Sequence, residues 1–152
     1  MGFHTFDPSM ADRLDDESRY RFCSREELLG ALDAGGAPDG DRDANSDGDS
    51  DDDSTAAGHL VDLGSGTGFA TEGLAPFFGR VSAVDIQPEM HELFRENGVP
   101  DTVDLVESST DSLPLGDDSA DAAVSTMTAH EIPLASTLAD LRRVLAPGSP
   151  VV

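Results

Sequence analysis

The chain has 152 residues, of which 31 are Asp or Glu and 9 are Arg; it contains no lysine, and its formal net charge is −22. A negative field of this size repels nucleic acid phosphates and anionic membrane surfaces. We therefore expect neither a nucleic acid nor a membrane as a partner.

The acidity runs through the whole sequence and is not confined to a tail. It resembles that of proteins from organisms that keep molar salt in the cytoplasm, where the Debye length is roughly 3 Å at 1 M and self-repulsion is screened. An acidic decoy for basic partners is the alternative.

The single cysteine, Cys23, excludes an internal disulfide and a cysteine-based metal site. Neither a signal peptide nor an apolar run of ~20 residues is visible, so we expect a cytoplasmic protein.

The N-terminal stretch, residues 1–34, is expected to form a helical cap. Ser24 followed three residues later by Glu27 has the pattern of a capping box at a helix N-terminus. Three leucines, at 28, 29 and 32, then form one apolar face, which predicts a helix over about 25–33. The pair Gly35-Gly36 is expected to end that helix.

Residues 35–58 differ completely in composition, because eight aspartates stand there with Gly and Ser against a single arginine. Such a segment buries too little apolar area to offset its ordering entropy, which predicts a disordered surface insertion. Asp47, Asp49 and Asp51 copy the first ligand positions of a calcium-binding loop, but the glycine and the terminal Glu of that loop are missing from their places. We predict no metal site.

The stretch 59–68 organises the rest of the chain. An apolar strand, 59–63, leads into Gly64, Gly66 and Gly68, and a helical pattern starts at Phe69. Such a turn lets a nucleotide-like ligand approach the backbone at a helix N-terminus. The absence of lysine excludes a phosphate-binding P-loop. Phe69 occupies the third position of a dinucleotide fingerprint, which weakens a nicotinamide site without excluding it. A merely tight turn also remains open.

Strands and helices are expected to alternate after this turn. The helix that follows it carries Ala70, Leu74, Phe77 and Phe78 on one face and ends near Ala75, because Pro76 removes a backbone hydrogen bond. The remaining expected elements are a strand over 80–86, a helix over 88–97 with Met90, Leu93 and Phe94 inward and His91 on the surface, strands over 103–106 and 120–126, a helix marked by Leu134, Leu138, Leu141 and Leu145, and a fifth strand starting at 149.

This order predicts right-handed βαβ units and hence an α/β fold with a doubly wound, mostly parallel sheet over 59–152. Ligands of such sheets bind at the topological switch point, where the glycine turn is expected to lie.

The pattern Asp62-x-Gly64-x-Gly66-x-Gly68 resembles the first motif of the class I S-adenosylmethionine-dependent methyltransferases. Asp85, 21 residues after Gly64, matches the acid that holds the cofactor ribose in that family. The stretches 113–124 and 141–148 are similar to the family's segments before its fourth and fifth strands. The resemblance, strongest to the small-molecule, type 11-like branch, implies that S-adenosylmethionine is the cofactor. The site residues that it implies are Asp62, Gly64, Ser65, Gly66, Gly68, Asp85, Ile86, Ser109, Thr110 and Asp111.

Two features depart from the family. Ser109 stands where the family often has an acid that accepts a hydrogen bond from the adenine amino group. The backbone of Thr110 is the expected contact for adenine N1. Family sheets normally have seven strands, whereas this chain ends inside the fifth, so we expect a truncated sheet that lacks the last two strands.

The methyl acceptor is expected to be a small molecule, because no motif for base or amide methylation follows the fourth strand. His130, at that strand's carboxyl end, and His4, in the cap, are the candidate acceptor contacts. No catalytic residue is assigned. A non-catalytic or truncated cofactor-binding regulatory module is the alternative function.

Overall fold

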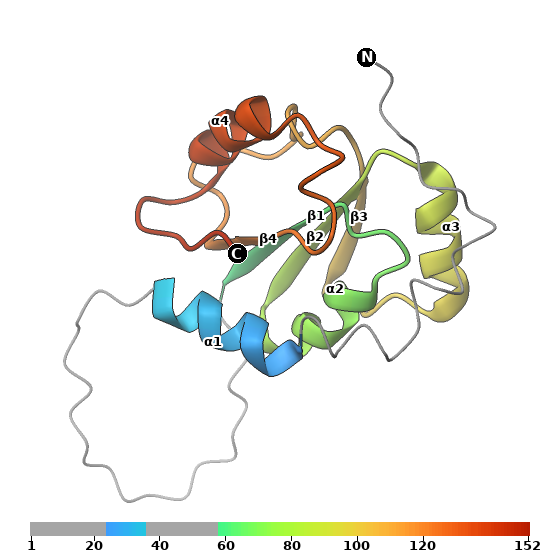
Figure 1. The fold of residues 1–152 in the computed structure, drawn as a ribbon. Helices are drawn as coiled ribbons and strands as arrows, with labels where there is room; N and C mark the ends of the chain where they lie inside the picture. The colour runs from blue at the N-terminus through green and yellow to red at the C-terminus, as the bar shows by residue number, and fades with distance from the viewer. Residues whose placement is uncertain (1–23, 36–57) are drawn as a thin grey trace, which may run out of the picture.

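The computed structural model describes residues 24–35 and 58–152 (Figure 1). The expectations for His4, Cys23 and the acidic insertion concern residues outside these ranges. The described elements are α1 (Arg25–Gly35), β1 (His59–Leu63), α2 (Phe69–Leu74), the 3₁₀ turn η3 (Ala75–Phe77), β2 (Arg80–Asp85), α3 (Pro88–Asn97), β3 (Val103–Glu107), β4 (Ala122–Val124) and α4 (Leu134–Val144). No helix in the described ranges is long and apolar enough to cross a membrane.

The sheet is parallel, with the strand order β3-β2-β1-β4, which confirms the doubly wound α/β prediction. Where the fifth strand is expected, the structure has an isolated parallel bridge between Ala123 and Val151: the N–H of Val152 donates to Ala123 O over 3.0 Å, and the N–H of Ser125 donates to Val152 O over 2.9 Å. β4 is shorter than the predicted 120–126 range. Ala120 forms only an isolated bridge to Leu145, and Thr126 already belongs to the loop that follows.

Helices cover both faces of the sheet, and each face has its own apolar core (Figure 1). The first core joins α1, α2 and α3 to one face and includes Leu28, Leu74 and Phe94. The second core joins α4 and the segment before β4 to the opposite face and includes Leu141 and Val144. The two layers hold the strands rigidly, so the loops at the carboxyl ends of the strands have a fixed base.

The capping box of α1 is confirmed. The N–H of Glu27 donates to Ser24 Oγ over 3.2 Å, and the N–H of Ser24 donates to Glu27 Oε2 over 3.0 Å. Leu28 and Leu32 are buried in the first core, so α1 is packed onto the sheet by the face that its leucines predicted.

Three helix faces differ from the prediction. Phe77, expected on the apolar face of the helix after the glycine turn, lies in η3 and is 47% exposed. His91, expected on the surface of α3, is fully buried, because its turn of the helix faces the glycine turn. On α4, Leu134 and Leu138 are about half exposed, and the buried face instead carries Thr137, Leu141 and Val144. In α3 and in α4, a polar residue (His91 or Thr137) is buried on the inner face, where apolar periodicity predicts apolar side chains.

Candidate functional site

The glycine turn after β1 is fastened to the end of β2. The backbone N–H groups of Gly64 and Ser65 donate to Val84 O over 2.8 and 2.9 Å. The N–H of Gly66 donates to Asp85 Oδ2 over 2.9 Å, while Asp85 Oδ1 accepts the N–H of Gln87 at 2.9 Å. The Asp85 carboxylate therefore ties the turn to the start of α3 and lies at the point where β1 and β2 end.

The three glycines of the turn all have positive φ, but they face different surroundings. A Cβ on Gly64 would lie 2.3 Å from the side chain of Thr128, and one on Gly68 would lie 2.3 Å from the ring of Phe94. A Cβ on Gly66 would meet nothing within 4 Å. Gly64 and Gly68 are thus needed for packing inside the protein, whereas Gly66 presents bare backbone to open space.

That open space is a cavity of about 290 Å³ at the carboxyl edge of the sheet, close to the lower end of the range for small-molecule sites. Its walls come from the ends of all four strands: the glycine turn, the residues after β2, the residues after β3 and the loop over 126–133. Of the residues predicted for the site, those that line the cavity are Gly64, Ser65, Gly66, Asp85, Ile86, Ser109, Thr110 and His130.

Asp62 does not line the cavity but lies behind the turn, fully buried. Its Oδ2 accepts the hydroxyl of Thr71 at 2.6 Å, and its Oδ1 has no hydrogen-bond partner. Burial raises the pKa of Asp62 to about 6, helped by the nearby charge of Asp85 and opposed by the Thr71 hydroxyl. A buried carboxylate with one unsatisfied oxygen is costly for the fold, which indicates a role beyond packing.

Gly68 and Asp111 also lie outside the cavity walls. Asp111 accepts the hydroxyls of Ser109 and, at 3.2 Å, Ser136. These hydrogen bonds, the one from Ser109 first, lower the pKa of Asp111. Asp111 itself does not line the cavity: its carboxylate joins Ser109, which does line it, to Ser136 of α4.

The wall opposite the glycine turn is the loop over 126–133. His130 lies in this wall, with its side chain 71% exposed and its Nε2 3.5 Å from Glu131 Oε1. Met127 lines the cavity beside it with a φ of 57°, a left-handed conformation that is unusual for a bulky side chain and is often found at functional sites. Sequence reasoning missed Met127 and Glu131, because a loop without a motif carries no pattern to predict which side chains turn inward.

His91 was also missed. Its Nε2 lies 3.3 Å from the hydroxyl of Ser65 in the glycine turn, and its Nδ1 has no partner. Burial lowers the pKa of His91, although the charges of Asp85 and Glu107 act in the opposite direction. A neutral imidazole therefore supports the turn from beneath. Across the described ranges, no group of three or more His, Cys, Asp or Glu side chains could hold a metal ion.

Comparison with known proteins gives one consistent picture. Residues 61–152 match the family model described as a methyltransferase domain. An uncharacterised methyltransferase of Mycobacterium tuberculosis is 38% identical over 93 residues, which cover 61% of this chain. The match spans only 37% of that relative's length.

Solved structures share the fold. An S-adenosylmethionine-dependent methyltransferase from Aquifex aeolicus has a TM-score of 0.70 and 26% identity, over 94% of this chain and 69% of its own. A protein from Methanococcus maripaludis also has a TM-score of 0.70, over 99% of this chain and 65% of its own. At 21% identity the latter shows the fold alone.

Proposed function

The chain belongs to the methyltransferase-domain family, and we propose that it binds S-adenosylmethionine in the cavity at the carboxyl edge of its sheet and transfers the methyl group to a small molecule. The observation that carries the proposal is the pairing of Gly66 with Asp85. Gly66 exposes backbone without a side chain to the cavity, and Asp85 places a carboxylate beside it.

The residues present fit this cofactor. An ionised carboxylate has about four acceptor sites, and the Asp85 carboxylate accepts one backbone N–H on each oxygen. Capacity remains on it for two ribose hydroxyls, as the family resemblance implies. Ser109 and Thr110 would flank the adenine, with Ile86, 54% exposed, as an apolar contact. Asp62 lies behind the turn and makes no contact with the cavity, so only the field of its charge would reach the ligand.

When bound, S-adenosylmethionine supplies a methyl group on a sulfonium, which an acceptor can displace in line with little covalent help from the protein. The task of the chain is to orient the two molecules and to exclude water. We assign the acceptor to the wall over 126–133, where His130 would contact it and could accept a proton if the acceptor must lose one.

The substitution Asp85→Ala is expected to weaken S-adenosylmethionine binding by roughly 1.5–3 kcal/mol, the scale of charge-assisted hydrogen bonds, or about ten- to a hundredfold. Isothermal titration calorimetry measures this directly. The matched control is Glu107→Gln, because Glu107 also ends a strand but lies outside the cavity walls and is paired with Arg95. It should leave the affinity unchanged. Equal affinities of the Asp85→Ala variant and the native chain would show that the ribose is held elsewhere.

A nicotinamide enzyme is the competing reading of a glycine turn followed by an acid. Thermal unfolding in the presence of S-adenosylmethionine, S-adenosylhomocysteine or NADH separates a methyltransferase from a nicotinamide enzyme. A ligand raises the unfolding temperature of a protein only if it binds the folded state. We expect both sulfur compounds to raise it and NADH to leave it unchanged. A rise with NADH alone would overturn the proposal.

We further propose that the protein works in a cytoplasm with molar salt. With 31 acidic residues and no lysine, self-repulsion at low ionic strength opposes folding. Raising KCl from 0.1 M to the molar range is expected to add about 2 kcal/mol of stability, a rise in unfolding temperature of roughly 5–15 °C. Scanning calorimetry with sucrose as the non-ionic control tests this. A constant or falling unfolding temperature in KCl would contradict the proposal.

A further inference from the structure

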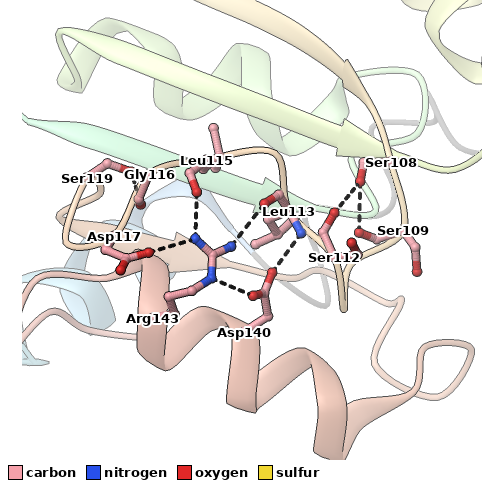
Figure 2. Close-up of polar contacts among 10 residues, drawn as sticks. All are labelled: Ser108, Ser109, Ser112, Leu113, Leu115, Gly116, Asp117, Ser119, Asp140 and Arg143. Atoms are coloured by element: carbon pink, nitrogen blue, oxygen red, sulfur yellow. Dashed lines mark hydrogen bonds and ion pairs between the residues drawn. The ribbon is translucent and has the colours of Figure 1, made fainter.

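Three side chains of α4 form hydrogen bonds to the segment that follows β3, part of which is a wall of the cavity. The buried hydroxyls of Thr110 and Thr137 lie 2.8 Å apart, and Ser136 donates to Asp111 over 3.2 Å. Farther along the helix, Asp140 Oδ2 accepts the N–H of Leu113 at 2.7 Å (Figure 2). The whole segment that follows β3 is therefore fastened to one face of α4.

Arg143 completes the fastening at the C-terminal end of the helix. Its guanidinium donates to Asp140 Oδ1 over 2.8 Å and to the carbonyl oxygens of Leu113 and Leu115 over 3.0 and 2.7 Å, as Figure 2 shows. These contacts lie beyond the cavity, and the two to Leu113 and Leu115 use main-chain carbonyls, so they hold the course of the chain. The contact between Thr110 and Thr137 differs, because Thr110 itself lines the cavity.

Thr137 also lies one helical turn after the end of the loop over 126–133, which forms the wall opposite the glycine turn. Its N–H donates to the carbonyl oxygen of Pro133, the last residue of the loop that forms that wall, over 2.9 Å. Thr137 is 1% exposed and Thr110 is 7% exposed, so the contact between the two hydroxyls is buried. Loss of one hydroxyl would leave the other buried and unsatisfied, and the wall would shift to relieve it.

We propose that Thr137 is a positioning residue for the nucleoside end of the ligand: its hydroxyl fixes Thr110 and thereby sets the affinity of the cavity for adenosine-containing molecules. The inference rests on the proposed function, because it assigns the wall after β3 to the nucleoside. Thr137 touches no ligand in this scheme and acts through Thr110 alone.

The test is the isosteric substitution Thr137→Val, with titration calorimetry of S-adenosylhomocysteine and of 5′-methylthioadenosine, which has the nucleoside end without the amino acid. Both dissociation constants are expected to rise about three- to tenfold, since one buried hydrogen bond is lost. Thr137→Ser, which retains the hydroxyl, should restore native affinity. Unchanged affinity in Thr137→Val, or a loss confined to S-adenosylhomocysteine, would overturn the assignment.

Ser82→Ala is the matched control for a purely structural loss. Ser82 is a buried hydroxyl bonded to His59 Nε2 at 2.8 Å and is absent from the cavity walls. It should lower the unfolding temperature comparably and leave both affinities unchanged. If Thr137→Val does not fold, Ser136→Ala removes an exposed contact of the same wall, and a loss of about twofold is expected. A native chain that binds neither S-adenosylhomocysteine nor 5′-methylthioadenosine would overturn the proposed function itself.

Discussion

Gly68→Ala is expected to destabilise the fold by about 2–5 kcal/mol, whereas Gly66→Ala leaves the chain folded and abolishes ligand binding. Gly68 has a φ of 97°, and its added methyl group would lie 2.3 Å from the Phe94 ring, which is fully buried and cannot move aside. The cost combines overpacking with a left-handed backbone. Gly66, at a φ of 55°, carries only the backbone cost of about 1–2 kcal/mol, and its methyl group stands in the cavity region.

The two variants form a matched pair, because each adds one methyl group to the same turn at positive φ. Chemical denaturation and S-adenosylhomocysteine titration on both give the two readouts independently. If Gly66→Ala binds as well as the native chain, the turn does not face the ligand. If Gly68→Ala is as stable as the native chain, the contact with Phe94 is not tight.

Replacement of Asp62 by Asn (Asp62→Asn) is expected to raise the free energy of unfolding, relative to that of the native chain, by about 3 kcal/mol as the pH rises from 3 to 8. The sign follows from the pKa of Asp62, which is raised from 3.8 in the unfolded chain to about 6 in the fold. Below 3.8 the carboxyl group is protonated in both states and costs nothing. Above 6 it is charged in both, and the fold bears the full cost of a buried charge. Asparagine does not titrate, so the difference between the two proteins isolates this group.

Urea unfolding of both proteins across this pH range gives the difference in the free energy of unfolding at each pH. A difference that is independent of pH would mean that Asp62 keeps an ordinary pKa in the fold. We also expect Asp62→Asn to bind S-adenosylmethionine more weakly, since a carboxylate that costs stability persists when function requires it. Calorimetry on the same samples measures both effects.

The sequence was sufficient to predict the sheet and a cavity at its carboxyl edge, because those depend on local signals. Alternating apolar strands, a capping box at Ser24 and glycines at every second position each act over a few residues. The carboxyl ends of parallel strands then meet at one edge by topology. The cavity walls after β1, β2 and β3 therefore contain most of the residues expected there.

The parts that could not be predicted depend on contacts between distant residues. Gly68 is required by Phe94, which lies 26 positions later, and no spacing within the motif separates its role from that of Gly66. His91 and Thr137 are polar residues on inward helix faces, and each has a hydroxyl partner far away in sequence: Ser65 for His91 Nε2 and Thr110 for the Thr137 hydroxyl. Apolar periodicity assigns such residues to the surface, because it counts only the transfer of side chains from water and not a partner that compensates for burial.

Calorimetric titration of the native chain with S-adenosylmethionine and S-adenosylhomocysteine in molar KCl shows whether the cavity binds the cofactor. Each compound is expected to bind at one site with a dissociation constant in the micromolar range, and Gly66→Ala is expected to remove the binding. A native chain that unfolds cooperatively in the same buffer, and so is folded, yet binds neither compound would contradict this expectation.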